Sequence, residues 1–125
     1  GDGNDTLRGG AGNDTLNGGS GIDLIDFSDA TAAINFTLVQ GAGSSFAASG
    51  LGTDTYSNME GVIGSSFNDT LTGSSGNDVI IGGSGADTMT GGLGSDTFVW
   101  RAGDASAVDT ITDFAAGLGG DALDI

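Results

Sequence analysis

Aspartate recurs in this chain at intervals of nine residues, in two runs. The seven aspartates of these runs are Asp5, Asp14, Asp23, Asp69, Asp78, Asp87 and Asp96. An apolar residue follows two places after each of them, and glycines precede them at the same interval. A carboxylate and the main-chain carbonyls that glycine leaves uncovered supply only oxygen ligands, which hard cations prefer. The spacing therefore predicts a series of similar cation sites along the chain.

Calcium is the cation that this chemistry favours. Flexible loops with about six to eight oxygen ligands suit Ca²⁺ better than the stricter octahedron of Mg²⁺. Zinc and copper are disfavoured because the chain has neither histidine nor cysteine. We expect the seven aspartates to be joined by main-chain carbonyls near Gly3, Gly10, Gly12, Gly19, Gly21, Gly76, Gly83, Gly85, Gly92 and Gly94.

Four further aspartates are weaker metal candidates, namely Asp54, Asp109, Asp113 and Asp121. At any single one of these, a solvated carboxylate in a turn or at a strand end is the simpler interpretation. Counting the aspartate pairs predicts several ions, about three to five, with the sites at the ends of the two runs the least certain.

The elements that must position these aspartates are very short strands. The clearest unit, residues 9–17, has six turn-forming residues followed by three that can extend, with an apolar residue at their centre. Successive side chains of a strand point to opposite faces, so this central side chain enters the interior. Two units make a coil of eighteen residues, and stacked coils place strands about 4.8 Å apart. Neighbouring rungs then carry Asp5 with Asp23, Asp69 with Asp87, and Asp78 with Asp96.

The predicted fold is all-β, a parallel β-roll (a β-helix solenoid) of nonapeptide repeats with a strand-containing insertion and a C-terminal β cap. The segments are residues 1–26 (first block), 27–63 (insertion with strands and a degenerate repeat), 64–99 (second block) and 100–125 (capping and secretion-related segment, truncated). Asp23 and Asp69 are separated by one residue more than five units, and this slip predicts two short rolls. Within the insertion, residues 34–38 alternate like a strand, 41–52 are expected to form a loop, and 50–56 resemble a further repeat.

Composition narrows the function. The chain has 26 glycines, two basic residues against 17 acidic ones, and a net charge of -15. Such a surface argues against nucleic acid and anionic lipid, which need Lys and Arg, and no stretch is apolar enough for a membrane span. We expect no enzyme activity in this fragment, because it lacks the histidine or lysine that activates a nucleophile. A flexible Gly/Ser linker is disfavoured, because a linker has no reason to repeat an apolar residue at one phase seven times.

The pattern Gly-Gly-x-Gly-x-Asp-x-apolar-x resembles the calcium-binding repeat of the RTX (repeats-in-toxin) family. It is complete in four units, residues 9–17, 18–26, 82–90 and 91–99, and it departs at residues 64–69, where Ser65 and Phe67 replace glycines. Residues 96–100, 108–114 and 120–125 are similar to the end of large RTX adhesins. That resemblance implies export by type I secretion machinery, a secreted or bacterial cell-surface location, and folding outside the cell.

Three functions remain open. The first is a calcium-binding RTX module that folds on Ca²⁺ binding after type I export, near the C-terminus of a bacterial adhesin. The alternative is the same module in a secreted hydrolase, such as a protease, a lipase or a polysaccharide-modifying enzyme. A third is recognition of polysaccharide or ice by residues 27–63, so cell-surface or polysaccharide ligands are further candidate partners.

Two structural expectations follow. We expect the metal-free chain to be largely disordered, because stacking aligns like charges. We also expect Phe98, Trp100 and Phe114 to cover the open end of the roll.

Overall fold

The computed structural model describes residues 1–41, 43–101, 104, 107–115, 117 and 119–125, and its named elements are all short strands. They are β1 (Thr6–Leu7), β2 (Thr15–Asn17), β3 (Leu24–Asp26), β4 (Asn35–Thr37), β5 (Ser44–Ala48), β6 (Gly52–Ser57), β7 (Gly61–Ile63), β8 (Thr70–Thr72), β9 (Val79–Ile81), β10 (Thr88–Thr90), β11 (Thr97–Val99), β12 (Thr110–Ile111) and β13 (Ala122–Asp124). The all-β class is confirmed. No helix in the described ranges is long and apolar enough to cross a membrane.

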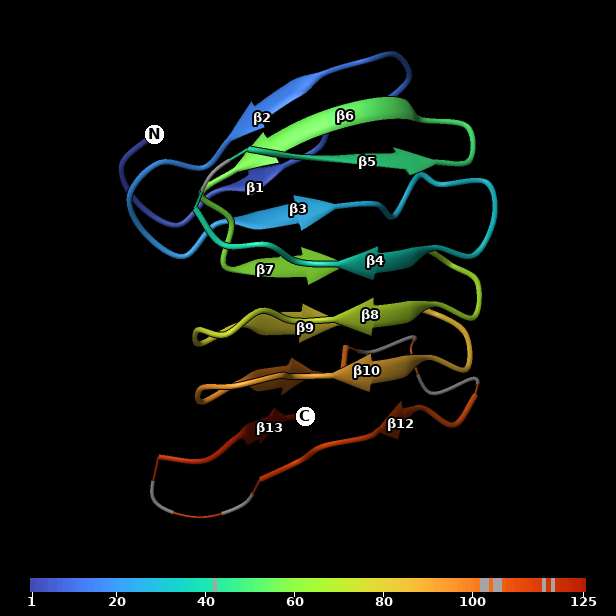
Figure 1. Cartoon of the computed structure of the whole chain (residues 1–125). Coiled ribbons are helices and arrows are strands. Elements are labelled where there is room, and N and C mark those ends of the chain that lie inside the picture. Colours follow the sequence, from blue (N-terminus) through green and yellow to red (C-terminus); the bar gives the residue numbers. More distant parts are fainter. Residues whose placement is uncertain (42, 102–103, 105–106, 116, 118) are drawn as a thin grey trace.

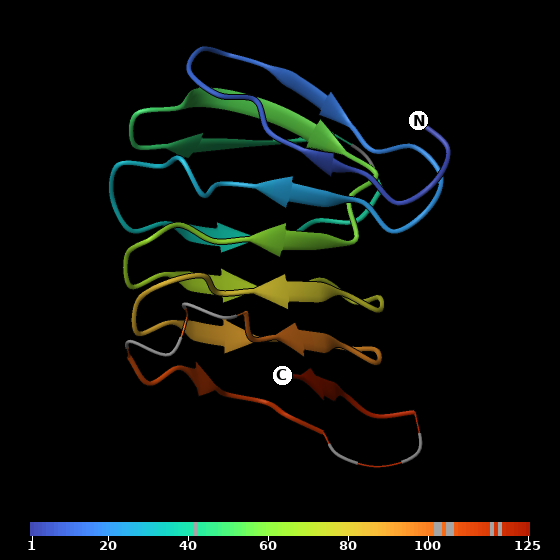
Figure 2. The ribbon, with the colours of Figure 1, turned by 180° about the vertical axis from the view of Figure 1, so that it is seen from behind.

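The strands form the two walls of a parallel roll (Figures 1 and 2). One wall is a six-stranded sheet in the order β1-β3-β7-β9-β11-β13, and the other is a four-stranded sheet in the order β12-β10-β8-β4. A three-stranded sheet, β2-β6-β5, lies at the N-terminal end. Strand pairs within the two walls are parallel, as the chain winds from one wall to the other and back. The predicted parallel β-roll is confirmed.

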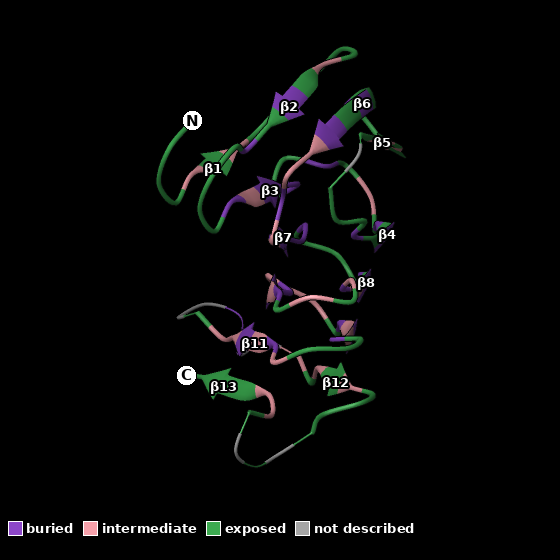
Figure 3. Cartoon of the chain, turned by 60° about the vertical axis from the view of Figure 1, so that its left-hand side comes forward, coloured by how far each residue is buried: buried purple, intermediate pink, exposed green. Residues whose placement is uncertain are grey.

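The register has the predicted eighteen-residue coil wherever the repeats are regular. Thr6 pairs with Leu24 in one wall, and Thr70 pairs with Thr88 in the other. The apolar residue at the centre of each strand faces the interior, because side chains of a three-residue strand alternate. Figure 3 shows this as buried central strands, with exposed residues at the loops and at both ends of the roll.

The two repeat blocks form a single roll, so the expectation of two short rolls is wrong. Strand β7, from the insertion, pairs with β3 of the first block and with β9 of the second. On the other wall, β4 pairs with β8. The insertion therefore supplies rungs of its own, which keep the walls continuous although the nine-residue phase is lost.

The expected loop at residues 41–52 is also wrong in part, because it contains β5. This strand pairs antiparallel with β6, Ser44 lying opposite Tyr56. The hairpin takes up the extra residues of the insertion while β6 pairs in parallel with β2. Strand β5 is hard to recognise in the sequence, because four of its residues are small and Phe46 is its only large apolar side chain. Residue 42 of this loop, and residues 102–103, 105–106, 116 and 118 of the C-terminal segment, lie outside the described residues.

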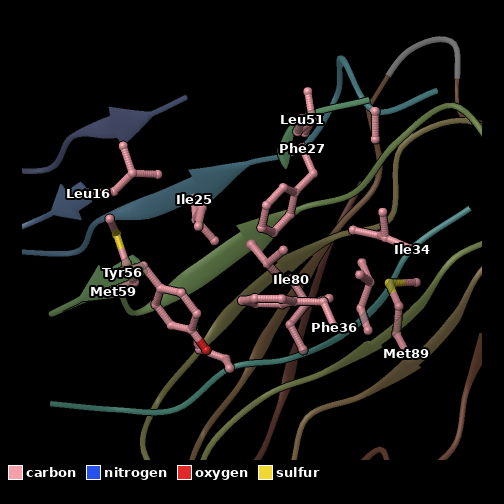
Figure 4. Packing of buried hydrophobic residues seen from close by; sticks show 14 of the residues in the cluster. Leu16, Ile25, Phe27, Ile34, Phe36, Leu51, Tyr56, Met59, Ile80 and Met89 are labelled. Carbon is pink, nitrogen blue, oxygen red and sulfur yellow. The ribbon is translucent and has the colours of Figure 1, made fainter. Parts of the chain in front are cut away.

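A single apolar core runs through the roll (Figure 4). Its members include the central strand residues Leu16, Ile25, Phe36, Tyr56, Val62, Leu71, Ile80, Met89 and Phe98, all buried. Where the four-stranded sheet ends at β4 and the three-stranded sheet ends at β5, aromatic rings join the two. The ring centroids of Phe36 lie 4.9 Å from Phe46 and 5.0 Å from Phe27, distances typical of favourable aromatic pairs.

The C-terminal rungs are β12 on β10 and β13 on β11. Phe98 is a fully buried core residue of β11 and not part of a cover over the end, as had been expected. Phe114 packs near it, with ring centroids 6.2 Å apart, and remains 43% exposed. The last rungs thus extend the roll, and the central apolar residue of its last strand, Leu123, is exposed to solvent.

Candidate metal sites

Acidic residues are aligned in columns along both walls of the roll. On the six-stranded wall, the residue before each strand is Asp5, Asp23, Glu60, Asp78, Asp96 or Asp121. On the opposite side the equivalent residues are Asp14 and Asp54, aligned by the pairing of β2 with β6, and Asp69, Asp87 and Asp109, which precede β8, β10 and β12. The parallel register stacks these residues directly, because strands of neighbouring coils start at the same level.

Hydrogen bonds from a main-chain N–H to the carboxylate of the next coil link most neighbouring members of the columns. The main-chain N–H of Asp5 donates to Oδ1 of Asp23 (2.8 Å), and that of Asp69 donates to Oδ1 of Asp87 (2.8 Å). The third pair eighteen residues apart, Asp78 with Asp96, has the same bond (2.9 Å). The predicted stacking of these three pairs is confirmed, whereas calcium binding by their side chains stays a prediction.

Three of the four weaker candidates lie in the same columns. Oδ1 of Asp54, Asp109 and Asp121 accepts the N–H of Asp14, Asp87 and Asp96 at 2.9, 2.8 and 3.0 Å. Asp113 has another place, since its two carboxylate oxygens accept the N–H groups of Gly91 and Gly92, each at 2.8 Å.

Glu60 is a column member that the nine-residue rule missed. Its Oε2 accepts the N–H of Asp23 at 3.0 Å, as an aspartate does elsewhere in the column. A different pattern identifies Glu60. Like the aspartates of the repeats, it stands two places before a buried apolar residue, in this case Val62. The same spacing finds Asp54 before the buried Tyr56, and Asp109 before Ile111, which is half-buried.

Four carboxylates leave one buried oxygen without a partner. These oxygens are Oδ2 of Asp14, Asp23, Asp87 and Asp96, which have no hydrogen bond to any part of the chain that the structure describes. A buried polar atom costs free energy unless it is hydrogen-bonded or bound to an ion. All four aspartates belong to units that begin with Gly-Gly, so the unsatisfied oxygen recurs with the repeat pattern.

The glycines of these loops bring main-chain carbonyls of neighbouring coils close together. Gly83 has φ +95°, and a Cβ there would lie 2.4 Å from the carbonyl oxygen of Ser65. At Gly94, with φ +113°, it would lie 2.3 Å from the carbonyl oxygen of Gly76. Only glycine allows this approach, because other residues add a Cβ and disfavour positive φ.

Seven other glycines named from the sequence occupy similar turns, whereas Gly76 has no positive φ. Positive φ is found at Gly3, Gly10, Gly12, Gly19, Gly21, Gly85 and Gly92. The carbonyl oxygens of Gly3 and Gly12 lie against Gly21 and Gly52 of the next coil in the same way. Carbonyl and carboxylate oxygens in flexible turns are the donor set that calcium prefers, so the residues present fit this ion.

Burial makes the carboxylates hard to ionise without a cation. The pKa of Asp87 is raised to about 6, first by loss of hydration and also by the charges of Asp69 and Asp109, against the hydrogen bond from the Asp69 N–H, which lowers it. Burial likewise raises the pKa of Asp96, and the charges of Asp121 and Asp113 add to the effect. The positive charge of a cation bound beside these oxygens would favour the ionised carboxylates and so oppose both shifts.

Side chains alone do not complete a metal site among the described residues. No group of three or more Asp or Glu lies close enough together there to hold an ion. Stacking spreads the carboxylates along each column instead of gathering them at one point. An ion at these loops therefore needs main-chain carbonyls for most of its ligands, which the glycine-rich turns present.

Residues 1–25 and 63–98 match the model of the RTX calcium-binding nonapeptide repeat family, in four copies. The matched residues make up just under half of the chain and contain all seven aspartates of the two runs. No curated protein matches the sequence. The match therefore covers the regular repeats, while β4, β5 and β6 lie in the unmatched segment between them.

Proposed function

Since the chain carries RTX calcium-binding nonapeptide repeats folded as a parallel β-roll, we propose that it is the calcium-binding module of a secreted protein and that it folds when it binds Ca²⁺. The observation that carries this proposal is the set of buried, unpartnered Oδ2 atoms of Asp14, Asp23, Asp87 and Asp96 within the described residues. Each lies in a glycine-rich turn that also presents carbonyl oxygens. These four carboxylates and the carbonyls of the stacked loops would hold the ions.

Calcium, when bound, supplies positive charge to columns that otherwise contain stacked acids. The chain itself offers little compensation, with a net charge of -15 and only two arginines. Burial and like charge raise the pKa values of Asp87 and Asp96, so ionised carboxylates oppose folding when no cation is present. Binding free energy then becomes folding free energy, because the unfolded chain does not hold these oxygens together.

Folding that waits for calcium suits a chain that is exported unfolded. We propose type I secretion, an extracellular or cell-surface location, and a place near the C-terminus of a bacterial adhesin. The resemblance of the C-terminal segment to the end of large RTX adhesins supports this context. A secreted hydrolase is the alternative parent. The sequence of the parent protein would distinguish an adhesin from a hydrolase, because tandem Ig-like repeats indicate an adhesin and a catalytic motif indicates an enzyme.

We propose that the module itself is structural and not catalytic. Its buried acids lie in repeated turns against main-chain groups, and the chain has no histidine or lysine to serve as a base for a nucleophile. Its role is then to hold a rigid rod-like segment together outside the cell. The insertion contributes to the same role, because β4, β6 and β7 are rungs of the roll.

Circular dichroism with and without calcium tests the proposal. We expect strand signal in millimolar Ca²⁺, its loss in excess chelator, and no recovery on adding Mg²⁺ at the same concentration. Isothermal titration calorimetry on the same samples gives the number of ions bound per chain. A strand signal that is unchanged in excess chelator, with no binding heat on calcium addition, would refute both the calcium site and calcium-driven folding.

A further inference from the structure

The six-residue loops of the roll have two different backbone conformations. Loops that begin with Gly-Gly have positive φ at their second and fourth residues, as at Gly83 (95°) and Gly85 (131°). The same holds for residues 9–14, 18–23 and 91–96. Loops 64–69 and 73–78 begin with Gly-Ser, are described at every residue, and contain no positive φ. The second residue of the loop thus separates the two conformations.

Serine closes the loop in the second conformation. The Ser65 N–H donates to Oδ2 of Asp69 at 2.5 Å, and its hydroxyl donates to Oδ1 at 2.7 Å. The Ser65 hydroxyl oxygen also accepts the N–H of Phe67 at 3.1 Å. Because one serine binds both oxygens of the aspartate four residues later, this loop is held together by its own groups.

The second Gly-Ser loop repeats these contacts. The Ser74 N–H donates to Oδ2 of Asp78 at 2.5 Å, and its hydroxyl lies 3.0 Å from Oδ1 and 2.9 Å from Oδ2. The hydroxyl oxygen again accepts an N–H two residues later, from Gly76, at 3.1 Å. Two occurrences with the same partners indicate a rule of the loop and not an accident of one site.

The two loop types differ at the oxygen that an ion would bind. In Gly-Gly loops, Oδ2 of the aspartate is buried and unpartnered, as in Asp87 and Asp96 of the described chain. In Gly-Ser loops, the serine N–H donates to that oxygen. Hydrogen-bond donors and cations approach the same lone pairs of a carboxylate, so a serine at the second position competes with calcium.

We propose that Ser65 and Ser74 close their loops against calcium, so that the carboxylates of Asp69 and Asp78 are held by serine and do not bind an ion. The calcium sites are then limited to the Gly-Gly loops, at residues 9–14 and 18–23 towards one end of the roll and at 82–87 and 91–96 towards the other. The rungs between them are held by protein groups alone. This inference rests on the proposed function, because it assumes that the Gly-Gly loops bind calcium.

The Ser74→Gly variant is the direct test, because it completes the pattern Gly-Gly-Ser-Gly-Asn-Asp with Gly76 already in the fourth position. Ser75→Gly is the matched control, since Ser75 lies in the same loop and is exposed. We expect calorimetric titration to give one more calcium ion per chain for Ser74→Gly than for the wild type. Ser75→Gly should leave the number unchanged.

An unchanged ion count in Ser74→Gly, with normal strand signal in calcium, would overturn the inference. If Ser74→Gly does not fold in calcium, the double variant Ser65→Gly/Phe67→Gly makes the same test in the other loop, where Phe67 blocks the second glycine position. A wild type that binds no calcium contradicts the proposed function itself. A wild type that binds calcium while neither opened loop adds an ion contradicts only the serine rule.

Discussion

Replacing Asp87 by asparagine should change stability in opposite directions with and without calcium. Asparagine keeps a side-chain oxygen that accepts the N–H of Asp69, a bond of 2.8 Å in the wild type. It removes the charge and replaces the buried, unpartnered Oδ2 atom. In chelator the variant should therefore be more stable than the wild type, whereas in calcium it should be less stable, because a ligand is lost.

The size of the metal-free effect comes from the carboxyl pKa. Burial is the main reason why the pKa of Asp87 rises from 3.8 to about 6, and the residue is 1% exposed. A shift of this size corresponds to ~3 kcal/mol at neutral pH. Asp87→Asn should thus raise the metal-free folding equilibrium by up to ~100-fold.

Asp69→Asn is the matched control, one coil away in the same column. Both oxygens of Asp69 accept hydrogen bonds, Oδ2 from the Ser65 N–H and Oδ1 from the Ser65 hydroxyl and the Ile34 N–H. An amide nitrogen in place of either oxygen faces a donor, which costs roughly 1–3 kcal/mol. This variant should therefore be destabilised to a similar extent with and without calcium.

Urea titrations followed by far-UV circular dichroism measure all three proteins in calcium and in chelator. An excluded osmolyte such as TMAO brings the metal-free folded fraction into a measurable range. The reasoning is refuted if Asp87→Asn destabilises the metal-free protein, or if the two variants respond to calcium alike. Either result would mean that the unpartnered oxygen of Asp87 is not the group that calcium satisfies.

Three further predictions concern pH, the turns and the core. The folded pKa of Asp87 is above its value of 3.8 in the unfolded chain, so metal-free stability should be greatest below about pH 4 and fall as the pH rises through about 6. Calcium affinity should rise over the same range. Urea titrations and calorimetry measure the two trends, and a metal-free stability that increases with pH contradicts the prediction. Gly83→Ala should cost roughly 1–3 kcal/mol more than Gly10→Ala in calcium, because both have positive φ but only the Cβ added at Gly83 would overlap a carbonyl oxygen. Equal midpoints in urea would show that the close approach is unimportant. Leu71 is fully buried, and Leu71→Ala should lower the free energy of unfolding by about 2–5 kcal/mol. Leu93 is 72% exposed, and Leu93→Ala should change it by no more than about 0.5 kcal/mol. Equal losses of stability in thermal unfolding would argue against a core built around Leu71.

Much of the roll was predictable because its rules are local. A nine-residue unit has room for one turn and one three-residue strand, so the buried residues at Leu71, Ile80 and Met89 and the eighteen-residue pairing of Asp69 with Asp87 follow from the period. The insertion was harder to predict because its rungs follow no period. Strand β7 and Glu60 keep only the acid two places before a buried apolar residue, and β5 keeps almost no apolar pattern.

The sequence by itself determined the repeat, the strand class and the oxygen-only chemistry, since periodicity, alternation and the absence of histidine and cysteine are properties of the chain alone. Tertiary structure decided how the coils stack across the insertion, because β7 joins β3 to β9 through pairings between distant residues. It also separated aspartates that are alike in the sequence. Asp78 and Asp96 occupy the same place in the repeat, but only the folded loop reveals that Ser74 binds the carboxylate of Asp78, while Asp96 keeps a buried oxygen with no partner in the described chain. Hydrogen-bond satisfaction depends on the backbone conformation of the whole turn, which the aspartate and its spacing do not specify.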